Sequence, residues 1–223
     1  MLELSGVRYQ PATAARPVLE DVNLQLAAGR LGLVAGPSGG GKTTLLEVIS
    51  GLAEPERGRI RWNGEVLNGR QRRWLCGLVF QFPERHFLGL TVGQELRLGH
   101  RRLQAGQMEQ VLERVGLGQL SPQQQPERLS GGQQRRLALA VQLLREAQVL
   151  LLDEPTAGLD WAVRGDVVGL LGDLAKERVV LVVTHEPELF RALEPQCWRL
   201  EQGRLSPMEQ GTLRTMPATG GRA

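Results

Sequence analysis

The segment GPSGGGKTT, residues 36–44, contains four glycines and only one charged side chain. It fits the pattern G-x-x-x-x-G-K-[ST], with Gly36, Gly41, Lys42 and Thr43 in register. Glycines let successive backbone N–H groups turn inward, so such a loop forms a nest for phosphates at the positive end of the following helix. A flexible glycine turn is the alternative, but the flanking strand and helix patterns favour a phosphate site.

Within this loop, we expect Lys42 to reach the β- and γ-phosphates of a nucleotide and the Thr43 hydroxyl to ligate Mg²⁺. The residues expected to surround the phosphates are Gly36, Pro37, Ser38, Gly39, Gly40, Gly41, Lys42, Thr43 and Thr44.

Two carboxylates end the apolar segment VLLLDEP, residues 149–155. Ligands of an open parallel sheet bind at the carboxyl ends of its strands, where this pattern places Asp153 and Glu154. Asp153 is predicted to bind Mg²⁺, directly or through water, and Glu154 to polarise the attacking water as a general base. An Asp-Glu pair that merely ends a strand is the alternative, which the glycine loop makes less attractive.

The segment LSGGQQRRLALAVQLLRE, residues 129–146, begins with Ser130 followed by Gln133 three residues later, the pattern of a helix capping box. Gly131 and Gly132 in the first turn lower helix propensity. Glycines at these two positions are explained if the backbone of this turn must approach a ligand closely, as at a second helix N-terminus that faces phosphate. A plain helix start is the alternative.

These residues need a parallel sheet to position them. Apolar runs at 31–36, 77–81, 149–153 and 179–185 are typical of strands buried on both faces, and helical periods follow at 42–52 and 163–174. Alternating patterns predict antiparallel strands at 2–8 and 18–26, an edge strand at 58–64 that ends in an Asn-Gly turn, and a C-terminal hairpin at 197–206.

Between these strands, residues 82–146 lack strand signals and are predicted to form a helical subdomain inserted in the sheet domain. Helical patterns occur at 93–115 and 129–146, with an exposed loop at 121–128. One domain is therefore predicted over residues 1–205, and a flexible tail over 206–223.

The composition is that of a globular protein, with 41% hydrophobic and 23% charged residues among 223, which excludes general disorder. A net charge of +3 with scattered arginines gives no indication of nucleic-acid binding. Cys76 and Cys197 lack metal-site spacing and are predicted to be buried thiols. No apolar run is long enough to span a membrane and the N-terminus lacks signal-peptide features, so a cytoplasmic location is expected and any membrane role requires a partner.

Five motifs in one order now identify a family. The glycine loop, LSGGQ, LLLDEP, AGLD (157–160) and VVTHE (182–186) closely resemble the ATP-binding subunits of ABC transporters over residues 2–205. The resemblance implies the α/β fold of the P-loop NTPases, a mainly parallel, helix-covered sheet with N-terminal antiparallel strands. It implies ATP and Mg²⁺ as the cofactors, and ATP hydrolysis as the activity.

The resemblance also assigns further roles. Tyr9 matches the aromatic residue that stacks on adenine, and Gln81 matches the glutamine that senses the γ-phosphate and Mg²⁺. Asp160 matches the aspartate that contacts the other subunit, and His185 matches the switch histidine at the γ-phosphate. The signature Ser130, Gly131, Gly132 and Gln133 is implied to close over the ATP of a partner, either a second copy or a homologous subunit.

The region after Gln81 resembles the ATPases of energy-coupling-factor importers, which take up metal ions and vitamins. Gln81, Pro83 and Glu84 keep that pattern, whereas His86 replaces the usual glutamine and Gln94-Glu95 replaces a frequent acidic pair. A second group of residues either lines a groove for a coupling helix of transmembrane subunits at the cytoplasmic face of the membrane or belongs to the core of the lobe: Phe82, Phe87, Leu88 and Leu90.

Other readings of the chain remain open. An exporter or another importer, or a non-transport ABC ATPase in cofactor assembly, would use the same nucleotide site. DNA-repair members carry long coiled coils, and translation-type members carry two such domains in one chain, features that this sequence lacks. If the chain bound nucleotide without hydrolysing it, another residue would be expected in place of Glu154 or His185. Both residues are present.

Overall fold

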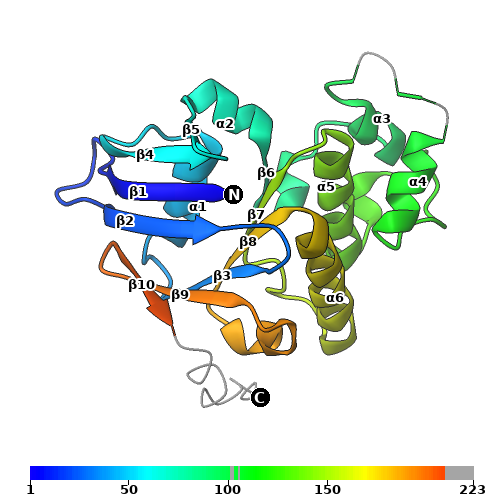
Figure 1. The fold of residues 1–223 in the computed structure, drawn as a ribbon. Coiled ribbons are helices and arrows are strands. Elements are labelled where there is room, and N and C mark those ends of the chain that lie inside the picture. The colour runs from blue at the N-terminus through cyan, green and yellow to red at the C-terminus, as the bar shows by residue number, and fades with distance from the viewer. Residues whose placement is uncertain (101–102, 105, 209–223) are drawn as a thin grey trace.

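The computed structural model describes residues 1–100, 103–104 and 106–208. It contains a four-stranded sheet, a six-stranded sheet and a helical lobe that lies on the opposite side of the molecule from the smaller sheet (Figure 1). The predicted α/β class, with a parallel sheet and N-terminal antiparallel strands, is confirmed.

The smaller sheet is antiparallel, in the order β2 (Leu19–Leu26), β1 (Leu2–Tyr9), β4 (Arg57–Trp62) and β5 (Glu65–Val66). The predicted edge strand at 58–64 is corrected, because β4 pairs with β1 on one side and with the short β5 on the other. The cause is the Asn63-Gly64 turn, where both residues have positive φ, 49° and 89°, so the chain reverses within two residues.

The larger sheet has the order β10 (Arg204–Met208), β9 (Gln196–Glu201), β3 (Gly32–Ala35), β8 (Val179–Thr184), β7 (Val149–Asp153) and β6 (Cys76–Val79). All neighbouring strands are parallel except β10, which pairs antiparallel with β9. Because β3, β8 and β7 are adjacent and parallel, the segments that follow them all emerge at one edge of the sheet.

The C-terminal hairpin is formed as expected, but β10 extends to Met208, so the sheet includes residues 206–208 of the predicted tail. Leu205 packs against the core of the smaller sheet, and the Glu20 N–H donates to the Gly203 carbonyl, which ties the hairpin to β2. The rest of the predicted tail, 209–223, lies outside the described residues.

Two hydrophobic cores fill the faces of the larger sheet. Alternate residues such as Val34 and Val183 join β1, β2 and α1 (Lys42–Ser50) in one core, whereas Leu33 and Val182 join α5 (Gly131–Leu144) and α6 (Trp161–Glu177) in the other. The apolar runs are therefore strands that are buried on both faces.

The lobe comprises α3 (Val92–Arg97), α4 (Gln107–Arg114), α5 and the short turns Pro83–His86 and Pro126–Arg128. The helix predicted over 93–115 is two helices, because Gly99 and Gly106 adopt positive φ, 81° and 84°, and Gly106 is the N-cap of α4. The short turn at 126–128 lies inside the predicted loop at 121–128.

Two further helical segments, α2 (Gly69–Leu75) and the turn Pro187–Leu193, have no apolar period that predicts them. No helix within the described ranges has the length and apolar character to cross a membrane. Cys76 and Cys197 are buried free thiols, as predicted, and burial raises their pKa values to about 12 and about 11.

Candidate functional site

The glycine loop connects β3 to α1, and its backbone requires glycine at two positions. Gly41 is the N-cap of α1 with φ 93°, and a Cβ there would lie 3.0 Å from the Val18 side chain. A Cβ on Gly36 would lie 2.4 Å from the carbonyl oxygen of Leu200. No side chain in the described part of the chain caps α1, so its first N–H groups are left for an anion.

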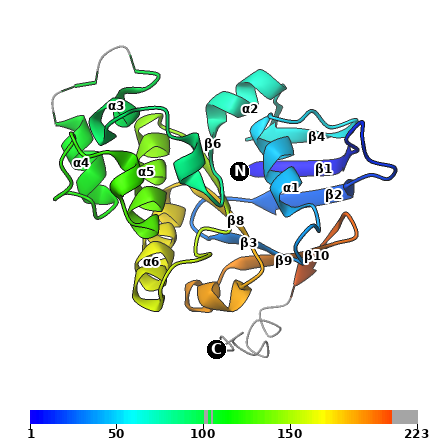
Figure 2. The same ribbon diagram turned by 180° about the vertical axis from the view of Figure 1, so that it is seen from behind.

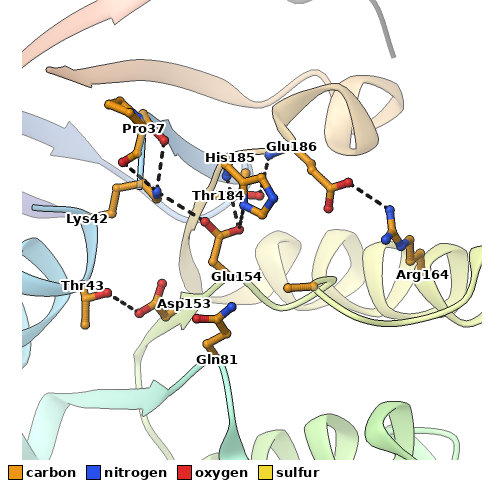
Figure 3. A network of polar contacts seen from close by, with 12 residues as sticks. Pro37, Lys42, Thr43, Gln81, Asp153, Glu154, Arg164, Thr184, His185 and Glu186 are labelled. Atoms are coloured by element: carbon orange, nitrogen blue, oxygen red, sulfur yellow. Dashed lines mark hydrogen bonds and ion pairs between the residues drawn. The ribbon is translucent and has the colours of Figure 1, made fainter. Parts of the chain in front are cut away.

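Lys42, the first residue of α1, folds its side chain back over this loop (Figure 3). The Lys42 Nζ donates to the carbonyl oxygens of Gly36, at 3.0 Å, and Pro37, at 3.2 Å. It also lies 3.4 Å from Glu154 Oε1, and both side chains of this ion pair are more than nine-tenths buried. The loop therefore concentrates one positive charge at the end of β3.

Thr43 and Asp153 connect α1 to the end of β7. The Thr43 hydroxyl donates to Asp153 Oδ2 at 2.6 Å, and the Gln81 side chain points toward the same carboxylate (Figure 3). Burial is the largest cause that raises the pKa of Asp153; the Glu154 charge adds to it, and the Thr43 hydrogen bond and Lys42 oppose it. The pKa of Glu47 on α1 is also raised, first by burial and then by the Asp153 charge.

The oxygens of Thr43, Asp153 and Gln81 are the hard donors that Mg²⁺ prefers. Within the described ranges, no cluster of three or more His, Cys, Asp or Glu side chains could hold a metal alone. The donor set therefore fits an ion that takes its remaining ligands from phosphate and water, as Mg²⁺ does.

Glu154 turns away from Asp153 and contacts the end of β8. Its φ of 47° lies in the left-handed region, and its N–H donates to the Val183 carbonyl at 2.9 Å. The Glu154 Oε2 lies 2.9 Å from His185 Nδ1 and accepts the His185 N–H at 3.2 Å. The carboxylate thus lies between an ammonium and an imidazole, while the His185 side chain stays half exposed. This geometry suits a carboxylate that takes a proton from water.

The signature residues form a separate group at the start of α5. The Ser130 hydroxyl accepts the Gln133 N–H at 3.3 Å, and Gln133 Oε1 accepts the Ser130 N–H at 2.9 Å, so the predicted capping box is confirmed. A Cβ on Gly132 would lie 2.3 Å from the Val163 side chain, so α5 packs closely on the first turn of α6. Asp160 caps that turn by accepting the Val163 N–H at 3.1 Å.

Nothing in the described residues links the signature to the glycine loop by a hydrogen bond or an ion pair. Both opposite views place α1 and α5 on different sides of the molecule (Figure 2). The structure brings Lys42, Thr43, Gln81, Asp153, Glu154 and His185 together, and leaves the signature and Asp160 apart from the glycine loop; these separate residues are Ser130, Gly131, Gly132, Gln133 and Asp160.

Tyr9 ends β1 on the side of the glycine loop. Its carbonyl accepts the Val18 N–H at 2.9 Å, and Val18 lies against Gly41. The ring is partly buried against the core of the smaller sheet. Tyr9 therefore lies near the glycine loop, and part of its ring is covered by the core of the smaller sheet.

Sequence patterns missed an ion pair beside His185. Arg164 of α6 lies 3.1 Å from Glu186, donates through Nε to the Leu159 carbonyl, and so joins the segment before α6 to the end of β8 (Figure 3). A second arginine, Arg135 of α5, contacts three chain segments. No local pattern identifies either residue, because their partners are distant in the chain. Glu186 lies 22 residues from Arg164, and Ala157 and Gln81 lie 22 and 54 residues from Arg135.

The four apolar residues of the lobe separate into two kinds. Phe87 packs against the core, which confirms the core reading for this residue. Phe82, Leu88 and Leu90 are exposed by 43%, 81% and 74%. The Arg85 guanidinium stacks over the Phe82 ring.

A strand-loop-helix phosphate site beside carboxylates at the ends of parallel strands defines a P-loop ATPase. The family model described as ABC transporter matches residues 19–157, and the chain belongs to this family. It is 40% identical over 218 residues to the ABC transporter I family member 11, chloroplastic, of Arabidopsis thaliana, covering 91% of this chain and 78% of that protein. It is also 40% identical over 210 residues to the energy-coupling factor transporter ATP-binding protein EcfA2 of Symbiobacterium thermophilum, covering 88% and 73%.

Solved structures agree with this assignment. The cbiO1 protein of Clostridium perfringens, described as part of the ABC transporter complex cbiONQ, matches with a TM-score of 0.83 at 27% identity, covering 92% of this chain and 86% of that one. The ATP-binding cassette MJ0796, a dimer bound to ADP and Pi, matches with a TM-score of 0.79 at 27% identity, covering 94% and 99%. The chain is therefore an ABC ATPase, the ATP-binding subunit of a transporter.

Proposed function

We propose that ATP binds with its phosphates on the glycine loop and with Mg²⁺ held by Thr43, Asp153 and Gln81. The observation that supports this most is the convergence of three strand ends on one buried set of charges. Lys42 binds the β- and γ-phosphates, and its contact with Glu154 gives way to them. Bound Mg²⁺ supplies charge neutralisation for the transferred phosphoryl group.

In this proposal, Glu154 accepts the proton of the attacking water, and His185 fixes the Glu154 carboxylate and contacts the γ-phosphate. The backbone of Glu154 is consistent with the assignment, because a left-handed φ on a non-glycine residue costs free energy and such strain recurs at active sites as well as in turns. Tyr9 stacks on the adenine from the end of β1.

We also propose that the signature residues Ser130–Gln133 serve a nucleotide held by a second copy, with Asp160 at the contact. Two observations support a composite site. The signature lies apart from the glycine loop within the chain, and the similar MJ0796 cassette is a dimer. A single copy then holds only half of each site and hydrolyses ATP poorly.

The transport partner is proposed to dock on the exposed apolar residues of the lobe, Phe82, Leu88 and Leu90. Similarity to an energy-coupling factor subunit and to part of the cbiONQ complex supports an importer of metal ions or vitamins. The chain is then peripheral to the membrane, at its cytoplasmic face, and acts through transmembrane subunits.

A mixing experiment tests the composite site. Lys42→Ala and Ser130→Ala chains are each expected to hydrolyse ATP slowly when tested alone. Random pairing gives mixed dimers in half of the cases, each with one intact interface and one doubly damaged interface. About a quarter of wild-type ATP hydrolysis is therefore the expected upper limit for the mixture. A demonstrated mixed dimer with no recovery of activity would contradict a site shared between two copies.

A second experiment tests the docking face. Tagged chain is purified from membranes, the bound protein is identified by mass spectrometry, and the Leu88→Ser/Leu90→Ser variant is compared with Leu52→Ser. Leu52 is a suitable control because it is also exposed, by 57%, but follows α1. Loss of a membrane-spanning partner only in the double variant is expected. Equal recovery of that partner by all three chains would exclude this face.

A further inference from the structure

Arg135 is a buried cation whose hydrogen bonds to the proposed nucleotide site all go to backbone carbonyls, not to the side chains that would hold ATP. It is the fifth residue of α5 and is 7% exposed. Burial lowers its pKa, and the nearby Glu84 charge opposes that shift. Placing a guanidinium here costs solvation energy, which an apolar side chain would not incur, so stability alone gives a weak reason for an arginine.

The guanidinium connects three chain segments. Its Nη1 donates to the Gly131 carbonyl at 3.3 Å, and its Nη2 donates to the carbonyls of Gln81, at 3.3 Å, and Ala157. Gln81 precedes the lobe, Gly131 is the first residue of α5 beside the signature Ser130, and Ala157 lies between the carboxylates of β7 and the N-cap of α6. One side chain thus binds the backbone at all three places.

The bonding pattern makes these segments interdependent. All three acceptors are backbone carbonyls, so the contacts fix main-chain positions rather than neutralise the charge. The carbonyls of Gln81 and Ala157 share a single nitrogen, so a shift of one alters the bond to the other. Within the described residues, Nε has no hydrogen-bond partner. A planar fork with several fixed donors suits this task, and a lysine ammonium does not reproduce it.

We propose that Arg135 is a positioning residue that couples Gln81 to the signature helix and to the segment between Glu154 and Asp160. A displacement of Gln81 when Mg-ATP binds is passed through the guanidinium to the first turn of α5 and to Ala157. Arg135 therefore sets the rate of hydrolysis without touching nucleotide. This inference rests on the proposed function, in which those segments surround ATP.

The test compares Arg135→Gln and Arg135→Lys with Arg178→Gln. Arg178 is a matched control because burial also lowers its pKa, its Nε also has no hydrogen-bond partner within the described residues, and it donates to a backbone carbonyl, that of Ala147, outside the proposed site. In both Arg135 variants, kcat for ATP is expected to fall about tenfold or more while the ATP dissociation constant changes less than about threefold, because misplaced segments slow turnover without removing phosphate contacts. Arg178→Gln is expected to leave both within about twofold.

Hydrogen exchange separates positioning from a merely structural role. In wild-type chain, Mg-ATP is expected to protect the glycine loop, the Gln81 segment and residues 156–160. In Arg135→Lys, protection of the glycine loop is kept and protection of 156–160 is lost. If kcat and this protection are both unchanged, or if both variants lower ATP affinity and thermal stability as much as kcat, Arg135 has no coupling role.

The same experiment distinguishes the two levels of the argument. If wild-type chain shows no protection of the glycine loop by Mg-ATP, the proposed function fails before any variant is considered. If the glycine loop is protected in every chain but 156–160 responds equally in all, only the role of Arg135 fails.

Discussion

The Lys42 site and the signature segment are both predicted to contact phosphate, yet they are built differently. At the Lys42 site, the ends of three strands bring together buried charges from residues more than 100 positions apart, as in the Thr43–Asp153 hydrogen bond. The first turn of the signature helix is instead capped locally, by hydrogen bonds between Ser130 and Gln133 three residues apart. The side chains of the first region are assembled by the sheet, whereas those of the second are presented by one helix N-terminus.

This contrast explains which half can act within one chain. The Lys42 site holds the Glu154 carboxylate and the Lys42 ammonium 3.4 Å apart. The signature has a satisfied cap and no described contact with a charge of that site. Changes at the first site should therefore affect chemistry or binding within a chain, whereas changes at the second should affect a contact between chains.

The largest expected effect is that of Glu154→Gln. The amide cannot accept the water proton, so the rate of phosphate release should fall by about 10²–10⁴-fold, while ATP binding and dimerisation are kept. Phosphate release and calorimetric ATP titration measure the two quantities. Glu177→Gln is the control, because Glu177 pairs with Arg114 at the exposed end of α6. Unchanged hydrolysis in Glu154→Gln would remove Glu154 as the general base.

Lys42→Ala should have the next largest effect, on binding. Its ammonium is the charge that the loop holds over its own carbonyls, so ATP affinity is expected to fall about tenfold or more. Calorimetry measures this loss. Lys176→Ala is the matched control, since Lys176 is the other lysine of the chain and makes an exposed pair with Asp173. Equal affinity in the two variants would contradict a phosphate role for Lys42.

Ser130→Ala sharpens the comparison through a second capping box in the same chain. Asn68 caps α2 with the same reciprocal bonds to Gln71 that Ser130 makes to Gln133. Ser130→Ala and Asn68→Ala should each lower the free energy of unfolding by about 1 kcal/mol, because each removes the side chain that caps its helix. Only Ser130→Ala should also reduce hydrolysis in the dimer. Similar hydrolysis in both variants, measured at matched thermal stability, would reduce the signature serine to a helix cap.

Local chemistry explains what the sequence could predict. The capping box at Ser130, the turn at Asn63-Gly64 and the apolar strands depend on residues close together in the chain, and all three are confirmed. The glycine loop is predictable because its residue types and their spacing have one dominant use, the binding of phosphate. The family resemblance supplies what these patterns could not, the roles expected of Tyr9, Gln81, Asp160 and His185.

Tertiary contacts explain what the sequence could not predict. The break between α3 and α4 depends on glycines at positive φ, which a helical period does not register. The contacts of Arg135 and the pair between Arg164 and Glu186 depend on how distant segments meet. The left-handed φ of Glu154 likewise cannot be predicted from the residue type. It occurs directly after β7, where the Glu154 N–H donates to the Val183 carbonyl of β8.

Asp153→Asn should shift the thermal midpoint only slightly without nucleotide, and the pH dependence of this shift has a defined sign. Because burial raises the native pKa of Asp153 above the ordinary value of 3.8, its contribution to stability is complete below that value and is lost as pH rises through the native pKa. The amide carries no charge to bury and still accepts the Thr43 hydrogen bond. Its thermal midpoint should therefore exceed that of wild type by about a few degrees at neutral pH and by less in acid.

Thermal unfolding of both chains from pH 4 to pH 8 without nucleotide measures this difference. Subtracting the wild-type midpoint from that of the variant at each pH cancels the titration of all groups whose pKa does not depend on the Asp153 charge. One group that does depend on this charge is Glu47, whose pKa should fall in the variant because part of its upward shift comes from the Asp153 charge. With Mg-ATP the order should reverse, since ligand stabilises the chain that binds it more tightly. A difference that is independent of both pH and Mg-ATP would show that the buried Asp153 carboxylate is neither destabilising nor part of the metal site.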